Sequence, residues 1–118
     1  MSQIKSAGDL IAEAQKEICC VSIEQAKKLY ESDSAAVIVD VRDADAAATS
    51  KLANSENISR GLLEMKIEKL CVQSDALILT HCGGGGRASL AAQSLQKMGY
   101  TNVHAITAKY DDIKAEFG

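Results

Sequence analysis

Residues 82–87 read Cys-Gly-Gly-Gly-Gly-Arg, between an apolar run at 76–80 and a helical pattern that begins at Arg87. Four residues without a β-carbon let successive backbone N–H groups turn toward one point, and the start of a helix adds partial positive charge there. An anionic sulfur at that point would be stabilised from several directions. A packing role explains this combination of residues poorly, so the stretch predicts cysteine chemistry at Cys82.

The composition is that of an ordinary globular chain. Of its 118 residues, 47% are hydrophobic and 25% are charged, and the net charge is −3. This length predicts a single domain, residues 1–118, whose core needs no disulfide or metal. With no basic cluster and only three Tyr and one Phe, the sequence argues against nucleic acid as a partner. No segment approaches membrane-spanning length, so we expect no membrane partner either.

Four cysteines, Cys19, Cys20, Cys71 and Cys82, indicate the redox setting. Residues 1–9 contain no apolar signal core and two of the cysteines are adjacent, which favours reduced thiols and predicts a cytoplasmic protein. No Cys-x-x-Cys pair occurs and there are only two His. We therefore expect neither a metal site nor a thioredoxin-type dithiol, and no organic cofactor is implied. Packing is the simplest role for Cys19 and Cys20, with a resolving or relay thiol as the alternative, and Cys71 is interpreted as filling the end of a helix.

Helices and strands alternate along the chain. Apolar residues at helical spacing, a Ser-x-x-Gln capping box at Ser22 and a C-terminal Gly99 mark helices. The predicted helices cover residues 6–18, 22–30, 43–52, 61–70, 87–98 and 108–117. Short apolar runs predict strands at 37–39 (followed by the polar 40–42), 57–59, 76–80 and 102–106. Leu70 and Met98 are among the helical residues expected to face inward.

This order predicts an α/β fold with a small central parallel sheet of about five strands and helices on both faces. Ligands of such folds bind beyond the carboxyl ends of the strands, where the loop 82–87 and residues 40–42 are expected. Asp40 and Arg42 are interpreted as structural hydrogen-bonding groups at a strand end. His81 should point to the face opposite Cys82, because neighbouring residues of a strand alternate, so adjacency gives no Cys-His pair.

Several segments in this order resemble the single-domain rhodanese family of sulfurtransferases. They are Val39-Asp40-Val41-Arg42-Asp43, Ser59-Arg60-Gly61-Leu62-Leu63-Glu64, Cys82 through Arg87-Ala88-Ser89, and Met98-Gly99-Tyr100-Thr101-Asn102-Val103. The resemblance implies a rhodanese-like fold and a cysteine that takes a sulfane sulfur from a donor, forms a persulfide and passes the sulfur to a nucleophile.

By position, the resemblance makes Cys82 the nucleophile and Arg87 an anion-binding or loop-bracing side chain. The backbone N–H groups of Gly83, Gly84, Gly85, Gly86 and Arg87 then form the substrate-binding cradle. The physical argument agrees, because thiolate is the attacking species and N–H groups, a helix start and a guanidinium all favour it. The implied partners are a small-molecule sulfur donor and acceptor, such as thiosulfate as donor, with a protein as an alternative acceptor.

The chain departs from the family in three places. Ser50 to Ser55 replaces a Gly-His-Ile-Pro-Gly-Ala turn, Ala108-Lys109 replaces a Gly-Gly pair, and the final helix has no Trp. These changes concern the rim of the pocket, and so the identity of donor and acceptor. Four glycines also leave the loop without side-chain contacts, so that either a bound anion orders it or the pocket is open. Two interpretations of Arg60 remain: it is either a second cation of the site or a surface residue.

Three other functions stay open. A cysteine phosphatase or arsenate reductase would use the same thiolate, N–H groups and arginine, but those families resemble Cys followed by five residues and Arg, and here four residues intervene. The shorter loop suits a sulfur-sized guest better than a tetrahedral phosphate. A persulfide carrier or sensor that needs a protein partner is the second alternative. The third is an inactive rhodanese-like interaction module, against which the presence of both Cys82 and Arg87 argues.

Overall fold

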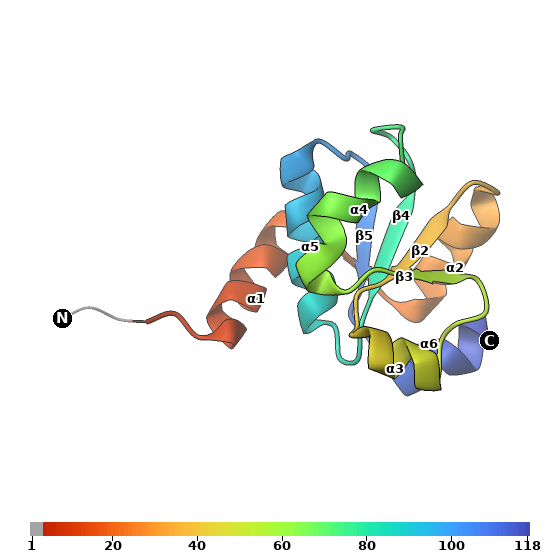
Figure 1. Ribbon diagram of the computed structural model, residues 1–118, viewed down its shortest axis with the longest axis horizontal. Coiled ribbons are helices and arrows are strands. Elements are labelled where there is room, and N and C mark those ends of the chain that lie inside the picture. Colours follow the sequence, from red (N-terminus) through yellow and green to blue (C-terminus); the bar gives the residue numbers. More distant parts are fainter. Residues whose placement is uncertain (1–3) are drawn as a thin grey trace.

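A computed structural model describes residues 4–118 as a five-stranded, all-parallel sheet covered by helices (Figure 1). The strand order is β1-β5-β4-β2-β3. The strands are β1 (Cys19–Val21), β2 (Val37–Asp40), β3 (Ser55–Asn57), β4 (Ile78–His81) and β5 (Val103–Ile106). The helices are α1 (Ala7–Glu17), α2 (Ile23–Ser32), α3 (Ala44–Thr49), α4 (Leu63–Leu70), α5 (Gly86–Met98) and α6 (Tyr110–Phe117), with a 3-10 turn η1 (Arg60–Leu62) before α4. The predicted α/β fold is confirmed.

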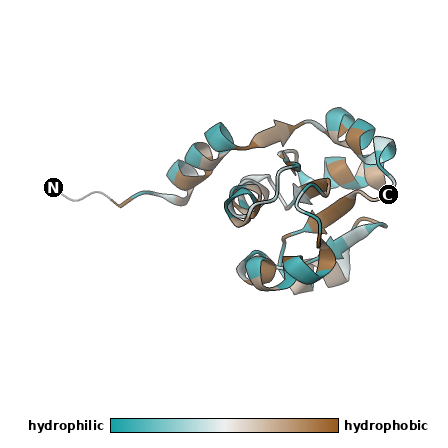
Figure 2. Ribbon diagram, turned by 90° about the horizontal axis from the view of Figure 1, so that it is seen from above, coloured by the Kyte–Doolittle hydropathy of each residue, from teal (hydrophilic) through white to brown (hydrophobic). Residues whose placement is uncertain are grey.

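Each face of the sheet carries its own hydrophobic core. Residues of α4 and α5 pack with Val39 and Ile78 on one face, and residues of α2 and α6 pack with Ile38 and Leu79 on the other. The hydropathy colouring of Figure 2 shows brown strands inside helices that carry teal, hydrophilic residues. Successive residues of β2 and β4 therefore serve opposite cores, as the alternation of a strand requires. None of the helices in residues 4–118 combines the length and apolar character needed to span a membrane.

The helix starts follow the capping signals in the sequence. Ser6 and Ser22 each close a full capping box, with Asp9 and Gln25 as the reciprocal partners, and α1 and α2 begin at the next residue. Gly99 takes a left-handed conformation, with φ +108°, and ends α5 as expected. Local signals were therefore sufficient to predict the boundaries at Ser22 and Gly99, whereas the capping box at Ser6 was not part of the sequence prediction.

Other boundaries differ from the sequence prediction. α3 ends at Thr49 instead of Leu52, β3 lies at 55–57 instead of 57–59, and α6 begins at Tyr110 instead of Ala108. Leu70 and Met98, expected to face inward, are 37% and 38% exposed because each lies at the last position of its helix. The edge strand β1 was not predicted; it has three residues and buries only Val21.

The connection from β4 to α5 is held by the backbone of the β5–α6 connection. Gly83 O accepts a hydrogen bond from the Tyr110 amide at 3.0 Å. Gly85 has φ +97°, and a β-carbon there would lie 2.9–3.1 Å from backbone atoms of Thr107. Gly84, by contrast, has no atom within 4 Å of the same position. Only the third glycine of the run is thus required by the fold for both its conformation and its close contact.

His81 is a fully buried polar residue on the α6 side of the sheet. Its ring stacks on Tyr110 with a centroid separation of 6.0 Å, and neither ring nitrogen has a hydrogen-bond partner among residues 4–118. Burial lowers the pKa of His81; the nearby Asp40 carboxylate and the Cys82 backbone act more weakly in the opposite direction. The ring is therefore neutral in the folded protein near pH 7.

We expect Gly85→Ala to destabilise the fold by about 1–3 kcal/mol, because the added methyl group meets the Thr107 backbone in a left-handed conformation. Gly84→Ala is the matched control, with an expected change within about 0.5 kcal/mol. Urea unfolding followed by circular dichroism measures both. Equal stability of the two variants would contradict the assigned role of Gly85.

We also expect His81 to make the fold acid-sensitive. Its folded-state pKa lies below that of the unfolded chain, so stability is complete above about pH 6.5 and falls as the pH drops below that value. One proton contributes a slope of at most about 1.4 kcal/mol per pH unit. His81→Phe keeps an aromatic ring against Tyr110 and should flatten the loss of melting temperature between about pH 7 and pH 5. An unchanged slope in this variant would refute the assignment.

Candidate active site

The Cys82 thiol lies at the centre of residues 82–87, which we call the thiol loop. Cys82 follows β4 directly, and the residue is 2% exposed. Its Sγ accepts hydrogen bonds from the Gly85 amide at 3.1 Å and from the Ala88 amide at 3.4 Å. Both donors belong to the last loop residues and the first turn of α5, where the helix dipole is positive. The sulfur is thus met by two backbone N–H donors at the start of α5.

The N–H groups of Gly83, Gly84, Gly86 and Arg87 are free of hydrogen bonds within residues 4–118, and the first two lie on the solvent side. Gly85 uses its amide on Cys82, and its carbonyl accepts from the Ser89 amide at 3.0 Å and from Ser89 Oγ at 2.7 Å. One amide of the loop, that of Gly85, therefore donates to the buried thiol, whereas the amides of Gly83 and Gly84 belong to exposed residues.

Arg87 lies at the outer rim of the thiol loop. Its side chain is 45% exposed, and a β-carbon on Gly83 would lie 3.9 Å from Arg87 Nη2. Arg87 Nη1 is 3.7 Å from Asp43 Oδ1, and the Asp43 side chain is 84% exposed. Because both side chains are exposed to solvent, this ion pair holds the Arg87 guanidinium only weakly. Sequence reasoning did not single out Asp43 for the site, although its position between β2 and α3 places it at the same sheet edge.

Arg42 and Asp40 form a buried pair at the end of β2. Arg42 Nε and Nη2 donate to the two carboxylate oxygens of Asp40 at 2.8–3.2 Å, and the Arg42 amide donates to Oδ1 at 3.0 Å. Burial alone would raise the pKa of Asp40, but the hydrogen bonds and charge of Arg42 hold it below its usual range. Asp40 and Arg42 thus satisfy each other, in line with the structural role expected for them.

Tyr110 lies next to the thiol loop, because its amide donates to Gly83 O, and sequence reasoning did not identify it. The Arg42 guanidinium carbon lies 3.9 Å from the centroid of the Tyr110 ring. Tyr110 Oη hydrogen-bonds Ser50 Oγ at 2.7 Å, and the Ser50 carbonyl accepts from Arg42 Nη2 at 2.6 Å. Ser50 begins the segment that departs from the family pattern, and it contacts both Arg42 and Tyr110. No local pattern in the sequence links these three residues.

The remaining cysteines lie apart from the loop. Cys19 and Cys20 are exposed on the edge strand β1, which corrects the expectation that they serve in packing. Desolvation, with Cys19 beside it, raises the pKa of Cys20. Cys71 is buried at the C-terminal cap of α4, as its interpretation as helix-end filler requires, and burial raises its pKa. In residues 4–118 no three His, Cys, Asp or Glu side chains gather as a metal site.

Arg60 does not reach the thiol loop. Its guanidinium pairs with Glu64 at 2.9 Å and donates to Ser94 Oγ at 2.7 Å. Ser94 lies seven residues beyond Arg87 on α5, which is about 10 Å along a helix. The structure therefore assigns Arg60 to the α4–α5 contact and not to the site.

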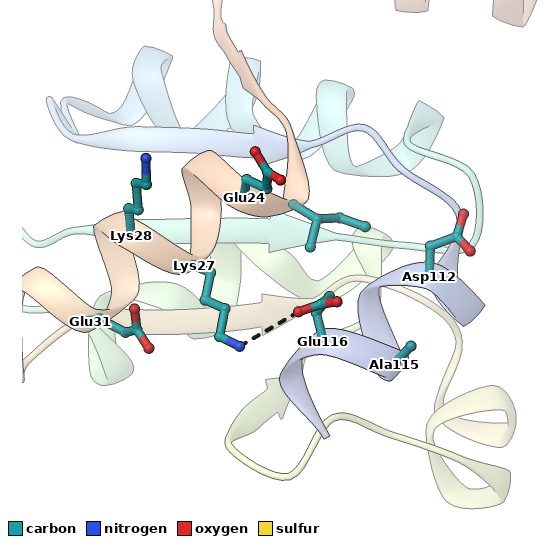
Figure 3. A pocket seen from close by; sticks show the side chains of 8 residues that line it. Glu24, Lys27, Lys28, Glu31, Asp112, Ala115 and Glu116 are labelled. Atoms are coloured by element: carbon teal, nitrogen blue, oxygen red, sulfur yellow. Dashed lines mark ion pairs between the residues drawn. The ribbon is translucent and has the colours of Figure 1, made fainter.

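A groove of about 680 Å³ lies elsewhere, between α2 and α6 (Figure 3). Its walls carry acidic and basic side chains of both helices, and the Lys27–Glu116 ion pair, at 3.6 Å, spans it. It contains no residue of the thiol loop. The charged side chains that line this groove include a pair that neutralise each other, and the groove contains no thiol among its lining residues.

Comparison with known proteins gives one family and a set of related folds. The sequence matches the family model of the rhodanese-like domain over residues 22–116. No curated protein matches the chain. A protein of unknown function from Rhodopseudomonas palustris, described as a possible tyrosine phosphatase, is 26% identical with a TM-score of 0.85, covering 100% of this chain and 96% of its own.

Two sulfurtransferases share the fold at lower identity. A human single-domain sulfurtransferase is 22% identical, with a TM-score of 0.69 over 84% of this chain and 96% of its own. The polysulfide-sulfur transferase homodimer of Wolinella succinogenes is 24% identical, with a TM-score of 0.75 over 91% of this chain and 80% of its own. With a family match over residues 22–116 and an all-parallel sheet that ends in a cysteine loop, the chain belongs to the rhodanese-like domain family.

Proposed function

We propose that this protein is a sulfurtransferase that carries sulfane sulfur on Cys82. The observation that supports it most is the buried Cys82 Sγ with two backbone N–H donors, from Gly85 and Ala88. Family membership and the sulfurtransferases among the structural neighbours support sulfur transfer in general. Reduced, exposed thiols at Cys19 and Cys20 are compatible with the cytoplasm as the site of action.

The proposed reaction has two displacements. The Cys82 thiolate attacks the outer sulfur of thiosulfate, the sulfur–sulfur bond of the donor breaks, and sulfite leaves with the bonding electron pair. Cys82 then holds a persulfide anion. A nucleophilic acceptor such as cyanide attacks the outer sulfur, forming thiocyanate and returning the thiolate. Each step conserves charge, and neither needs an external oxidant or a metal.

The outer part of the thiol loop fits the binding of an anionic donor. The unpaired amides of Gly83 and Gly84 offer hydrogen bonds to the donor's oxygens, and the exposed Arg87 supplies the positive charge. Gly86 and Arg87 contribute the start of α5, whose dipole acts in the same direction. In this proposal Cys82 and Arg87 are catalytic, and residues 83–87 bind substrate. A protein persulfide could use the same amides as donor or acceptor.

Phosphate transfer is the competing enzymatic function, because one structural neighbour is described as a possible tyrosine phosphatase. Four residues separate Cys82 from Arg87, and two backbone donors, Gly85 of the loop and Ala88 of α5, are directed at Sγ. The Arg87 guanidinium pairs outward with Asp43. This compact loop favours a single added sulfur over a tetrahedral phosphoryl group. A persulfide carrier that serves a protein partner uses the same Cys82 chemistry and differs only in the acceptor.

We expect thiosulfate to add one sulfur to the reduced wild-type protein and none to Cys82→Ser, as read from intact-mass spectra. Cyanide should then remove that sulfur and release thiocyanate. The Cys19→Ser/Cys20→Ser double variant is the matched control; it lacks the exposed thiols and should load like wild type.

Three other outcomes separate the alternatives. Loading from glutathione persulfide but not from thiosulfate would replace the donor and keep the mechanism. A loaded protein that turns over only with a protein acceptor would identify a carrier. Hydrolysis of p-nitrophenyl phosphate that depends on Cys82, without sulfur loading by any donor, would refute sulfur transfer in favour of a phosphatase.

We expect the Asp43–Arg87 pair to limit anion binding. Arg87→Ala should raise KM for thiosulfate by about tenfold, and Arg87→Lys should recover part of that loss. Asp43→Asn releases the guanidinium and should lower KM by about twofold to fivefold, in the range of an exposed ion pair. Arg60→Ala removes an equal charge outside the loop and serves as control. If Asp43→Asn raised KM, the competition between Asp43 and the substrate would be disproved.

A further inference from the structure

The N-terminal helix α1 lies outside the family match, which begins at residue 22, yet it contacts the thiol loop. Figure 1 shows α1 beside α5, at the end of the molecule where the chain begins. Ala14 is the buried residue of α1, with no exposed surface. Two hydrogen bonds join the helices: Gln15 Nε2 donates to Ser89 Oγ at 3.1 Å, and Gln93 Nε2 donates to Glu17 Oε2 at 3.2 Å.

Only the first of these bonds continues to the thiol. Ser89 is fully buried, and its hydroxyl, which accepts from Gln15, donates to the Gly85 carbonyl at 2.7 Å. The Gly85 amide in turn donates to Cys82 Sγ at 3.1 Å. Three hydrogen bonds, the last two joined through the covalent backbone of Gly85, thus link the Gln15 side chain of α1 to the sulfur. Because this series holds the carbonyl of the residue whose amide faces the sulfur, it restrains the backbone of Gly85 on both sides.

A second contact from α1 explains the fourth glycine. A β-carbon on Gly86 would lie 2.8 Å from Ile11 Cδ1, closer than carbon atoms approach without displacement. Gly86 is the first residue of α5, where alanine would otherwise be the better helix former. The absence of a side chain at Gly86 leaves room for Ile11 against the loop. The two ends of the Gly85–Gly86 peptide are therefore both contacted from α1, directly or through Ser89.

We infer that α1 positions the thiol loop for chemistry, with Gln15, Ser89 and Ile11 as positioning residues that act through Gly85 and Gly86. The inference rests on the proposed role of Cys82 as nucleophile. When the Gln15–Ser89–Gly85 series is broken, Gly85 samples more conformations, its amide faces Sγ for less of the time, and the thiolate loses a donor. Sulfur loading and alkylation of Cys82 should both slow at neutral pH.

The test compares Gln15→Ala and Ser89→Ala with Gln93→Ala, which removes the other α1–α5 bond without touching the loop. Alkylation of Cys82 by iodoacetamide is followed by fragment-ion mass spectrometry, with the exposed Cys19 and Cys20 as an internal reference. We expect Gln15→Ala and Ser89→Ala to slow Cys82 alkylation about twofold to tenfold near pH 7, while Gln93→Ala matches wild type. The double variant Gln15→Ala/Ser89→Ala should be no slower than Ser89→Ala, because both belong to one series.

The pH dependence separates positioning from mere support of the helix. All rates should converge near pH 10, where free thiols are ionised and the missing amide no longer decides the thiolate fraction. A lowered melting temperature without a change in the pH–rate profile would assign α1 a purely structural role. The inference is overturned if Gln15→Ala and Ser89→Ala alkylate like Gln93→Ala.

A second pair of variants tests the Ile11 contact. Gly86→Ala should slow Cys82 alkylation, since the new methyl group meets Ile11 Cδ1 and shifts the loop against α1. Ile11→Val deletes that one carbon atom, and the double variant Ile11→Val/Gly86→Ala should return to the wild-type rate. If the double variant stays slow, the alanine acts within α5 alone and the α1 contact is refuted.

Alkylation also keeps this inference apart from the proposed function. A wild-type protein that is alkylated at Cys82 but loads no sulfur from any donor would refute sulfur transfer and leave the α1 test intact. A protein that loads sulfur equally well in wild type, Gln15→Ala and Ser89→Ala, with equal alkylation rates, would refute only the role of α1.

Discussion

The close approach of Gly85 to the Thr107 backbone is the constraint on which the site depends. In a parallel sheet with neighbouring β4 and β5, the connections that follow both strands meet at one edge. A β-carbon on Gly85 would lie 2.9–3.1 Å from backbone atoms of Thr107, so this approach requires a residue without a side chain, and its φ of +97° favours glycine as well. This position turns its amide toward Cys82 Sγ, so backbone geometry, and not a catalytic side chain, provides the environment of the sulfur.

Contacts from three neighbouring segments order a loop whose glycines would otherwise make it flexible. Disorder was the expected cost, about 0.5–1 kcal/mol for each glycine relative to alanine, with a bound anion as one remedy. Instead, Tyr110 donates its amide to Gly83, Thr107 packs on Gly85, and Ser89 binds the Gly85 carbonyl. The inner half of the loop is thereby ordered by the protein itself. A β-carbon on Gly84, by contrast, would meet no atom within 4 Å.

Sequence reasoning succeeded where a single segment carries the information. Ser22 with Gln25 fixes the start of α2, Gly99 fixes the end of α5, and the position of Cys82 after an apolar strand indicates its place at the sheet edge. Sequence reasoning failed where a structural feature depends on contacts between distant parts of the chain. Strand β1 exists because Cys19–Val21 pairs with β5, and only one of its three residues, Val21, is buried. Likewise, the contact of Tyr110 with Arg42 joins residues 68 positions apart in the chain.

The two arginines at the sheet edge, Arg42 and Arg87, differ in burial and in the partners of their charges. Arg42 is buried and fully engaged by Asp40, the Ser50 carbonyl and the Tyr110 ring, so it shapes the site without offering a free charge. Arg87 is exposed at the rim, where the anionic donor that we propose would meet its charge. The sulfur itself is met by amide dipoles only. That arrangement fits a thiolate that becomes a persulfide anion, because both carry one negative charge and neither state leaves a buried cation unpaired.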